Sequence, residues 1–488
     1  MTVPTGGEDG TAVVIGASMA GLLAARVLAE HVGRVVVLDR DTLPEDAVAR
    51  GGAPQSAHAH GLLARGRRAL EELLPGLTAD LVARGAVPGD MQADFRWISQ
   101  GLPMAAATSG LEGLMVSRPL LEREVRRRVL ADPRIGVRER VDVRSLVHDA
   151  SGRVTGVAGL DRDDPGGDGL RRWDADLVVD ASGRQSSAPE WLAASGFEPP
   201  EEERVEVDVA YATRLYRREP GHLDGALGIA LAGTPDNPRG GVLLAQEGDR
   251  WICGLGGILG DRPPLDPAGF EAYAASLPSP ALYEVIRSAV PLGEPRRFRF
   301  PASVRRRYER LARSPRGLLV TGDAVCSFNP VYGQGMAVAA LEALALRDVL
   351  RGGLDRPSLA QEFWRACAPV VDVPWQIAAG GDRRFPGVPG PVDRRTRLLN
   401  GYVARVQRAA AVDPAVGTAF LRVANLEAPP PSLMAPSVLV RVVRASRRVP
   451  AVPRVPAAAT IRSPDRRVSD PTVGGEVGRA AVRSDALR

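Results

Sequence analysis

The chain has 488 residues, more than one ordinary domain, and 44% of them are hydrophobic, as in a globular protein with an ample core. No stretch approaches the roughly 18 consecutive apolar residues that a membrane helix needs. The first ten residues are polar and lack the basic start and apolar middle of a signal peptide. We therefore expect a cytoplasmic protein that does not insert into membranes.

The net charge of +5 does not indicate a nucleic-acid partner, because it is not spread over a domain. Residues 447–488 contain nine arginines and four acidic residues, and the rest of the chain is balanced. All 63 basic residues are arginines, which excludes any chemistry that needs a catalytic lysine. Cys253, Cys326 and Cys367 are widely spaced, so we expect buried structural cysteines and no metal site.

The first forty residues predict a dinucleotide-binding unit of strand, helix and strand. These elements are expected at residues 13–15, 19–30 and 34–38. Gly16 permits a sharp turn, and Gly21 permits close packing of the helix on the first strand. Ser18 replaces the middle glycine of the usual motif, and the helix start offers free amides to a pyrophosphate. Asp39 ends the second strand, where it is placed to accept hydrogen bonds from a ribose.

Apolar periodicity and turn residues predict the remaining elements. Helices are expected at residues 61–74 and 118–130, a hairpin at 154–160 and 170–173, a strand at 177–179, an antiparallel sheet from about 205 to 259, a strand at 318–320, and helices at 335–350 and from 359 to about 424. The glycines of residues 253–261 precede prolines rather than a helix, so they predict a strand and no second nucleotide-binding unit. From Ala428 the content of proline, arginine and alanine rises, and we expect the end of the chain to be disordered.

A second motif places Gly322 and Asp323 at the end of a buried strand and residues 330–336 before a helix. Here the sequence resembles the para-hydroxybenzoate-hydroxylase-type flavin monooxygenases. The resemblance implies that Asp323 reaches the ribityl chain of FAD and that the Pro-x-x-Gly-x-Gly loop lies against the isoalloxazine. Amides at the start of the following helix can stabilise negative charge on the reduced flavin.

Two further segments resemble the same family. Asp180-Ala-Ser-Gly183 stands where many members have Asp-Gly, a variant that we associate with flavoenzymes acting on alkenes and isoprenoids. Arg118 opens a helix, as in relatives whose arginine reaches the ribose or phosphate side of FAD. The predicted cofactor-binding residues are Gly16, Ser18, Met19, Ala20, Gly21, Asp39, Arg40, Arg118, Val143, Asp180, Gly183, Gly322, Asp323, Pro330, Gly333, Gln334, Gly335 and Met336.

The segments PQSAHAHGLL, SRPLLEREVR, VAYATRLYRR, FNPVYGQGM and DVPWQIAAGGDRRFPGV extend the similarity over nearly the whole chain. Together they resemble a subgroup of actinobacterial flavin epoxidases that act on polyene polyketides in polyether biosynthesis. This resemblance implies that Gln55, His58 and His60 bind or orient the cofactor, and these three are also the candidates for a catalytic role. The candidates for substrate contact are Trp375, Arg383 and Phe385.

The implied fold is α/β, with an FAD-binding Rossmann-like domain of the glutathione-reductase type interleaved with an antiparallel-sheet substrate domain, plus C-terminal helices. We expect FAD-binding segments at residues 8–75, 106–195 and 296–352, substrate-domain segments at 76–105 and 196–295, a helical region at 353–430 and a disordered tail at 431–488. No feature of the sequence specifies an oligomeric state.

The implied activity is monooxygenation, in which a flavin C4a-hydroperoxide epoxidises an alkene of an apolar, polyketide-type small molecule. NAD(P)H would act as a transient reductant and O₂ as co-substrate. An alkene needs no protein base, and the sequence shows no clear base, which favours epoxidation over aromatic hydroxylation. The alternatives are an aromatic hydroxylase of polyketide tailoring, a non-oxygenating flavin reductase or cyclase of the geranylgeranyl-reductase kind, and an inactive flavin-binding scaffold. A halogenase is disfavoured, since that group uses a catalytic lysine and a WxWxIP segment, and the chain has neither.

Overall fold

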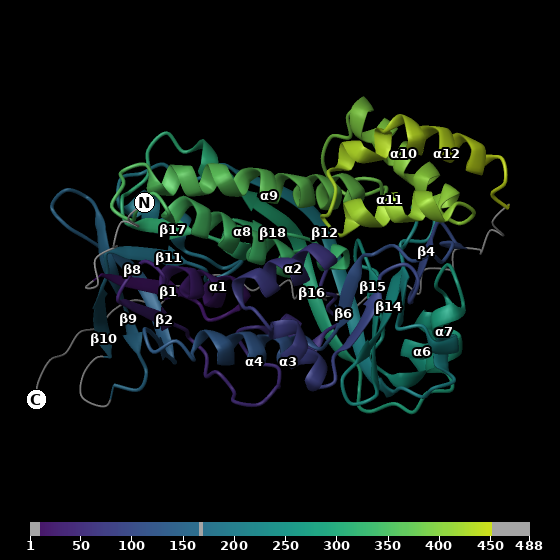
Figure 1. The fold of residues 1–488 in the computed structure, drawn as a ribbon, viewed down its shortest axis with the longest axis horizontal. Coiled ribbons are helices and arrows are strands. Elements are labelled where there is room, and N and C mark those ends of the chain that lie inside the picture. Colours follow the sequence, from purple (N-terminus) through teal and green to yellow (C-terminus); the bar gives the residue numbers. More distant parts are fainter. Residues whose placement is uncertain (1–9, 165–168, 451–488) are drawn as a thin grey trace, which may run out of the picture. The chain divides into compact units, whose positions relative to one another are not determined.

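The computed structural model describes residues 10–164 and 169–450, which contain a five-stranded parallel sheet (Figure 1). The strand order is β17-β11-β1-β2-β7. The strands are β1 (Thr11–Ile15), β2 (Arg34–Leu38), β7 (Ile135–Arg138), β11 (Leu177–Asp180) and β17 (Leu318–Val320). Every residue of β11 and β17 is buried, as expected for short valine- and leucine-rich strands covered on both faces.

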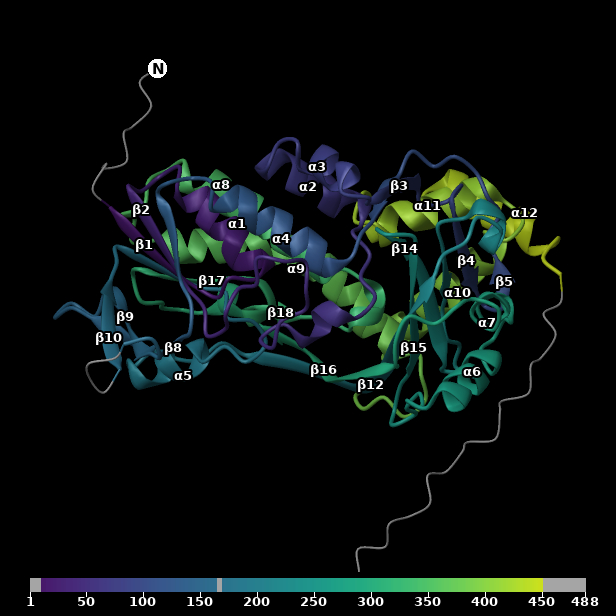
Figure 2. The same ribbon diagram turned by 90° about the horizontal axis from the view of Figure 1, so that it is seen from below.

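Helices cover one face of this sheet, and a small antiparallel sheet lies on the other (Figure 2). The helices are α1 (Met19–Leu28), α4 (Arg118–Val129), α8 (Gly335–Leu350) and α9 (Leu359–Asp382), and α8 packs against both α1 and α9. The antiparallel sheet has the order β10-β9-β8, with β8 at Val141–His148, β9 at Val154–Asp161 and β10 at Leu170–Asp174. The expected hairpin of β9 and β10 is confirmed.

The second large sheet has eight strands in the order β18-β16-β12-β15-β14-β13-β4-β5. Its strands are β4 (Phe95–Ser99), β5 (Leu102–Pro103), β12 (Glu202–Arg217), β13 (Gly228–Leu231), β14 (Gly240–Gln246), β15 (Arg250–Gly257), β16 (Arg296–Arg306) and β18 (Cys326–Ser327). All pairs are antiparallel except β13 with β4, which is parallel. We expected the third FAD-binding segment to begin at residue 296. The strand that begins there, β16, pairs with β12 in this eight-stranded sheet.

The remaining elements are short and connect or flank the two large sheets. They are α2 (Ala64–Leu73), α3 (Leu77–Ala83), α5 (Ala188–Ala194), α6 (Pro267–Ala275), α7 (Ala281–Ile286), β3 (Val87–Asp90), β6 (Glu112–Met115), and the single-turn helices η1 (Pro54–Ala57), η2 (His222–Gly225), η3 (Tyr308–Arg310), η4 (Gly322–Ala324), η5 (Pro330–Tyr332) and η6 (Pro430–Met434).

Three C-terminal helices form an apolar cluster of their own: α10 (Arg394–Ala409), α11 (Pro414–Ala424) and α12 (Pro436–Ser446). The expectation of disorder from residue 431 is wrong for α12, since Val442 and Ala445 are buried against α10 and α11. Val438, Val442 and Ala445 follow helical spacing, which the high arginine and proline content concealed. The rest of the expected tail, residues 451–488, lies outside the described residues.

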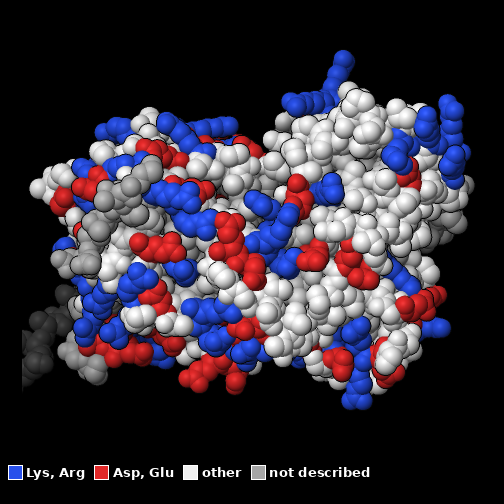
Figure 3. Space-filling model, in the orientation of Figure 1, with Lys and Arg blue, Asp and Glu red and all other residues white. Residues whose placement is uncertain are grey.

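Charged side chains of both signs are interspersed over most of the face shown in Figure 3. Arginines with few acidic neighbours stand over the C-terminal helices at the upper right. None of the described helices is long and apolar enough to cross a membrane.

Gly21 tests the packing of α1 on β1, because a Cβ there would overlap the carbonyl oxygen of Gly16. We expect Gly21→Ala to lower the free energy of unfolding by about 2–3 kcal/mol, the usual effect of overpacking. Gly401→Ala is the matched control, since Gly401 lies within α10 and a Cβ there meets no atom within 4 Å. It should stabilise the protein by about 0.5–1 kcal/mol. Urea unfolding measures both, and equal effects would contradict this account of Gly21.

Candidate functional site

A large cavity of about 1660 Å³ runs from the carboxyl ends of β1, β11 and β17, past the eight-stranded sheet, to the C-terminal helices. Pockets for a single small molecule usually enclose roughly 300–1000 Å³. The volume is therefore sufficient for two molecules side by side.

The ends of three parallel strands meet at one end of this cavity. Ile15 of β1 lies opposite Asp180 of β11, which lies opposite Val320 of β17. A Cβ on Gly16 would lie 2.6 Å from the carbonyl oxygen of Ala181, too close for any side chain. The N-terminal turn and the loop after β11 are therefore in contact.

The Gly322-Asp323 motif folds back beside the N-terminal turn, although about 300 residues separate them in sequence. A Cβ on Gly322 would lie 2.6 Å from the Cβ of Ala20 in α1. Gly322, Asp323 and Gly16 all line the cavity. This juxtaposition is the one that the resemblance requires.

Asp39 at the end of β2 supports the Gly16 turn directly. The amide of Gly16 donates to the carbonyl of Leu38 over 2.7 Å, and the amide of Ala17 donates to Oδ2 of Asp39 over 2.6 Å. Nη1 of Arg50 lies 3.3 Å from Oδ1 of Asp39, and both side chains are buried. Sequence reasoning missed Arg50, because an ion pair across a loop has no periodic signal.

Ser18 begins a partly buried hydrogen-bonded chain that leads to the PQSAHAHGLL segment. Its hydroxyl donates to Oε1 of Glu122 over 3.1 Å, and Nη2 of Arg118 donates to the same oxygen over 3.0 Å. Nη1 of Arg118 lies 3.2 Å from Nε2 of His60, whose Nδ1 lies 3.0 Å from the carbonyl oxygen of His58. The chain links α1, α4 and the histidine loop.

The tautomer of His60 follows from these partners. A guanidinium only donates, so Nε2 of His60 accepts from Arg118 and the ring proton resides on Nδ1, which donates to the backbone. Burial lowers the pKa of His60 to about 3, and the nearby charge of Arg118 adds to the effect. His60 is therefore neutral with both nitrogens engaged, which suits the positioning of Arg118 better than proton transfer.

His58 lies behind the cavity wall rather than in it. Its Nδ1 is 2.8 Å from Oγ1 of Thr213, and its ring packs edge-on against Tyr211 with centroids 4.9 Å apart. Burial lowers the pKa of His58 to about 4. Of the three candidates in this segment, Gln55 and His60 line the cavity and His58 does not.

Asp180 also differs from expectation. Its side chain is fully buried and does not line the cavity. Oδ1 accepts from the amide of Ser182 over 2.9 Å, and Oδ2 accepts from the hydroxyl of Ser186 over 2.5 Å. Burial raises the pKa of this carboxyl. Asp180 thus holds the loop that presents Gly183 to the cavity, instead of facing a ligand itself.

The Gly322 turn has a buried support of its own in Glu342 of α8, which sequence reasoning missed. Oε2 of Glu342 accepts from the hydroxyl of Thr321 over 2.8 Å and from the amide of Gly322 over 2.6 Å. Burial raises the pKa of Glu342 to about 7. Burial also raises the pKa of Asp323, while Arg118 and Arg184 act in the opposite direction.

The loop before α8 completes this end of the cavity. Gly333 has φ of +65°, a conformation that favours glycine, and Gln334 occupies the N-cap position of α8. Oε1 of Gln334 is buried and has no hydrogen-bond partner within residues 10–164 and 169–450. The predicted cofactor residues that line the cavity are Gly16, Ser18, Met19, Ala20, Asp39, Arg40, Arg118, Val143, Gly183, Gly322, Asp323, Pro330, Gly333, Gln334, Gly335 and Met336; Gly21 and Asp180 lie outside the lining.

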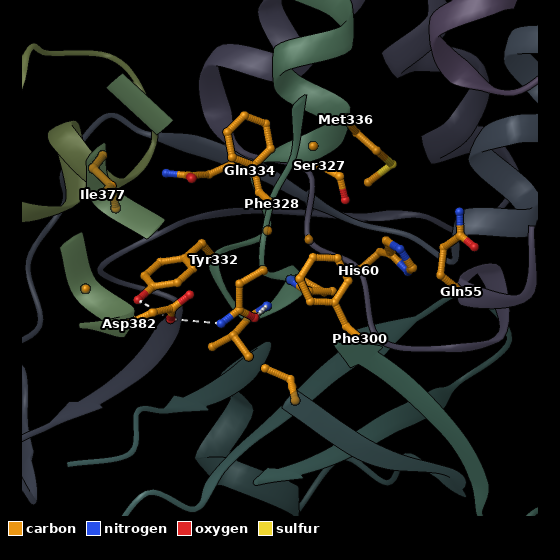
Figure 4. Close-up of a pocket in the computed structure, with 18 of the residues that line it drawn as sticks. Gln55, His60, Phe300, Ser327, Phe328, Tyr332, Gln334, Met336, Ile377 and Asp382 are labelled. Atoms are coloured by element: carbon orange, nitrogen blue, oxygen red, sulfur yellow. Dashed lines mark hydrogen bonds between the residues drawn. The ribbon is translucent and has the colours of Figure 1, made fainter. Parts of the chain in front are cut away.

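The far part of the cavity is bordered by α9, the eight-stranded sheet and the C-terminal helices. Trp375, Arg383 and Phe385 line it, and Nε1 of Trp375 donates to Glu203 over 3.1 Å. In Figure 4, Tyr332 and Asp382 lie on one side of the cavity, and Gln55 and His60 lie on the other. The apolar lining includes Phe95, Trp97, Val242, Leu244, Leu255, Phe300, Phe328, Ile377, Phe420 and Leu433.

The strand-end part of the cavity fits the ADP and ribityl parts of FAD. Gly16 and Gly322 form a cradle that any Cβ would fill, and the first amides of α1 have no partner within the helix. α8 directs a second helix start at the same space. No cluster of three or more histidine, cysteine or acidic residues that could hold a metal occurs in the described part of the chain.

Comparisons with known proteins agree with this geometry. The family profile described as an FAD binding domain matches residues 9–221. Protein Rv3254 of Mycobacterium tuberculosis (strain ATCC 25618 / H37Rv) is 35% identical over 431 residues, covering 86% of this chain and 90% of that protein.

Two solved structures illustrate the shared fold. The p-nitrophenol 4-monooxygenase PnpA from Pseudomonas putida DLL-E4 matches with a TM-score of 0.59 and 16% identity, over 86% of this chain and 98% of its own. The flavin-dependent halogenase CmlS matches with a TM-score of 0.58 and 14% identity, over 86% of this chain and 77% of its own. At these identities the two structures establish the fold alone.

The similarity to Protein Rv3254 places both proteins in one family, and the profile identifies the N-terminal half as an FAD-binding domain. The chain therefore belongs to the family of Protein Rv3254 and carries an FAD binding domain, on a fold that it shares with flavin-dependent monooxygenases and halogenases.

Proposed function

We propose that this enzyme epoxidises an alkene of a large, apolar, polyketide-type metabolite. The observation that carries the proposal is the cavity of about 1660 Å³, whose lining as a whole is more apolar than polar. Such walls offer contact area to a long hydrocarbon chain and few partners to a small polar substrate. The resemblance of nearly the whole chain to polyether-pathway epoxidases agrees with this substrate class.

We assign the strand-end part of the cavity to FAD, residue by residue. Asp39 and Arg40 would hold the adenosine ribose, Ser18 and the start of α1 the pyrophosphate, and Asp323 the ribityl chain. The loop from Pro330 to Gly335 would lie against the isoalloxazine. When bound, FAD supplies the redox and oxygen-activating chemistry, with NAD(P)H as a transient reductant and O₂ as co-substrate.

The protein's own contribution is positioning and exclusion of water. The start of α8 places a partial positive charge beside the cofactor space, where negative charge develops on reduction. The apolar walls keep water from the reacting atoms. The π bond of an alkene is itself the nucleophile, so epoxidation requires no protein base.

Aromatic hydroxylation is the second candidate, and one observation favours it. Asp382 is a buried carboxylate in the cavity wall, and burial raises its pKa to about 6. Such a group can accept the proton of a phenol near neutral pH. The sequence revealed no base of this kind, so the lack of a base no longer favours epoxidation. Halogenation remains disfavoured, because the 488 residues include no lysine.

The cofactor assignment predicts how Arg118 and His60 contribute to FAD affinity. Arg118→Ala should raise the Kd for FAD about tenfold or more, because it removes charged donors from the cavity. His60→Ala should raise it by a smaller factor, since His60 only positions Arg118. The double variant should bind FAD no more weakly than Arg118→Ala alone.

Titration of the apoprotein with FAD, followed by flavin fluorescence, measures these constants. Arg123→Ala is the matched control, because Arg123 lies on the same helix but pairs with Glu124 outside the cavity. Additive effects of the two alanine substitutions would refute the positioning role of His60. A Kd unchanged in Arg118→Ala would remove Arg118 from the FAD site.

The reaction is tested by supplying NAD(P)H and ¹⁸O₂ to the holoenzyme together with a polyene polyketide or an aromatic polyketide. We expect one ¹⁸O atom in an epoxide of the polyene, detected by mass spectrometry. Label in a phenolic hydroxyl of the aromatic compound alone would establish the second candidate instead. Product formed without oxygen would identify a flavin reductase or cyclase and overturn both.

A further inference from the structure

A three-residue cluster lies in the cavity wall away from the strand ends. It joins Asp382, the last residue of α9, to Asn329 and Tyr332 at the η5 turn (Figure 4). Oδ1 of Asp382 accepts from Nδ2 of Asn329 over 2.9 Å and from the hydroxyl of Tyr332 over 3.1 Å. Oδ2 is buried and has no hydrogen-bond partner in the described part of the chain.

Two features of the surrounding structure fix the geometry of this cluster. Oδ1 of Asn329 accepts from the amide of Val331 over 3.1 Å, so the other end of this side chain can offer Asp382 only its NH₂ group. Gly381 has no side chain, and a Cβ there would overlap the hydroxyl of Tyr332. The loop and the helix are thus shaped to bring two donors onto a single carboxylate oxygen.

The position of Asp382 is unfavourable for an acid without a further partner. It is 2% exposed and ends α9, where the helix dipole opposes negative charge. Burial raises its pKa to about 6, while the bonds from Asn329 and Tyr332 and the charge of Arg384 lower it. Arg384 itself donates to the carbonyl of Gly233 over 3.0 Å. Buried polar atoms in native proteins nearly always have a hydrogen-bond partner. Oδ2 of Asp382 has none in the described part of the chain.

Asp382 is one of the residues that line the cavity. We propose that Asp382 is the polar anchor of the substrate site, and that its Oδ2 accepts a hydrogen bond from a hydroxyl group of the substrate. The inference rests on the proposed function, in which a large apolar molecule occupies the far part of the cavity. It adds that this molecule carries a hydroxyl, which a carboxylate or an acceptor-only group cannot replace.

A hydroxyl group held at a fixed point of the cavity determines which carbon of the substrate meets the cofactor. Phe300, Phe328 and Ile377 also line the cavity, and their apolar contacts do not impose a particular orientation on a ligand. A hydroxyl on Asp382 fixes the position of the hydrocarbon chain along the cavity. Asp382 therefore selects both the substrate class and the site of reaction.

The test is a binding titration of the oxidised holoenzyme, in which ligand binding is followed by the change in flavin absorption. The probes are geranylgeraniol and geranylgeranial, which share a carbon skeleton but differ in that only the alcohol donates a hydrogen bond. At pH 8 we expect the native holoenzyme to bind the alcohol about tenfold more tightly, the effect of one hydrogen bond to a charged group.

Asp382→Asn should invert this preference. The carbonyl oxygen of the asparagine would replace Oδ1 as the acceptor for Asn329 and Tyr332, leaving its NH₂ group to donate to the aldehyde. The matched control is Asp393→Asn, which removes a charge from an exposed N-cap residue of the same cavity. This control should keep the native preference, because asparagine also caps a helix well.

The native holoenzyme provides a second test that does not depend on the folding of a variant. Lowering the pH from 8 to 5 should abolish the preference for the alcohol around pH 6, as Asp382 becomes protonated and its free oxygen becomes a donor. The other ionisable groups that act on Asp382 are Tyr332 of η5 and Arg384 after α9. Burial raises the pKa of Tyr332 further above this range, so its hydroxyl stays protonated throughout the titration.

Equal affinities for the two probes at pH 8, or a preference that persists in Asp382→Asn, would overturn the inference. These titrations involve no turnover, so their result is separate from that of the ¹⁸O₂ experiment. A preference for the alcohol without incorporation of ¹⁸O would support the anchor and reject the proposed reaction. Incorporation of ¹⁸O without the preference would do the reverse.

Discussion

The turns that follow β1, β11 and β17 pack so closely on one another and on α1 that only glycine fits at Gly16 and Gly322. At Gly16 a Cβ would approach the loop after β11, and at Gly322 it would approach α1. This contact brings into one cavity two segments that are distant in sequence. A pyrophosphate can approach the start of α1 only where no side chain intervenes. The cofactor end of the molecule therefore depends on the absence of side chains at these positions.

Buried carboxylates support the loops around this contact. Asp39 accepts from the amide of Ala17, Asp180 from the amide of Ser182, and Glu342 from the amide of Gly322. In a low-dielectric interior such bonds are stronger than in water, and an unpaired partner is costly. Glycine permits several conformations in these turns, and the hydrogen bond to the buried carboxylate selects one of them. The same rule makes the unpartnered oxygen of Asp382 informative, because that side chain supports no turn amide and faces the cavity.

Local patterns predicted the regular elements well. β2 and α8 have the expected bounds, because valine runs, helix-start glycines and apolar periodicity are encoded within each segment. The fold class followed from joining these segments through the resemblance. Glu342 and Arg50 were not predicted, because the sequence around a single polar residue in a helix or loop does not indicate which residue it contacts. His58, a candidate for binding or orienting the cofactor, lies behind the cavity wall, because the direction of a side chain in an irregular loop depends on packing. α12 was not predicted, because the high arginine and proline content was given more weight than the helical spacing of the apolar residues.

The Asp382 cluster joins the two ends of the cavity. Asn329 and Tyr332 belong to the loop that continues through Gly333 and Gln334 into α8, beside the space assigned to the cofactor. Asp382 belongs to α9, and the side-chain NH₂ of Asn400 in α10 donates to the carbonyl of Gly380, two residues before Asp382. A ligand bound to Asp382 therefore contacts a carboxylate that already holds the cofactor-side loop. Because coupling between two binding sites is reciprocal, a cofactor that orders this loop also favours the ligand. The proposed cofactor and substrate sites thus share one short loop, and the hydrogen bonds of Asn329 and Tyr332 connect them.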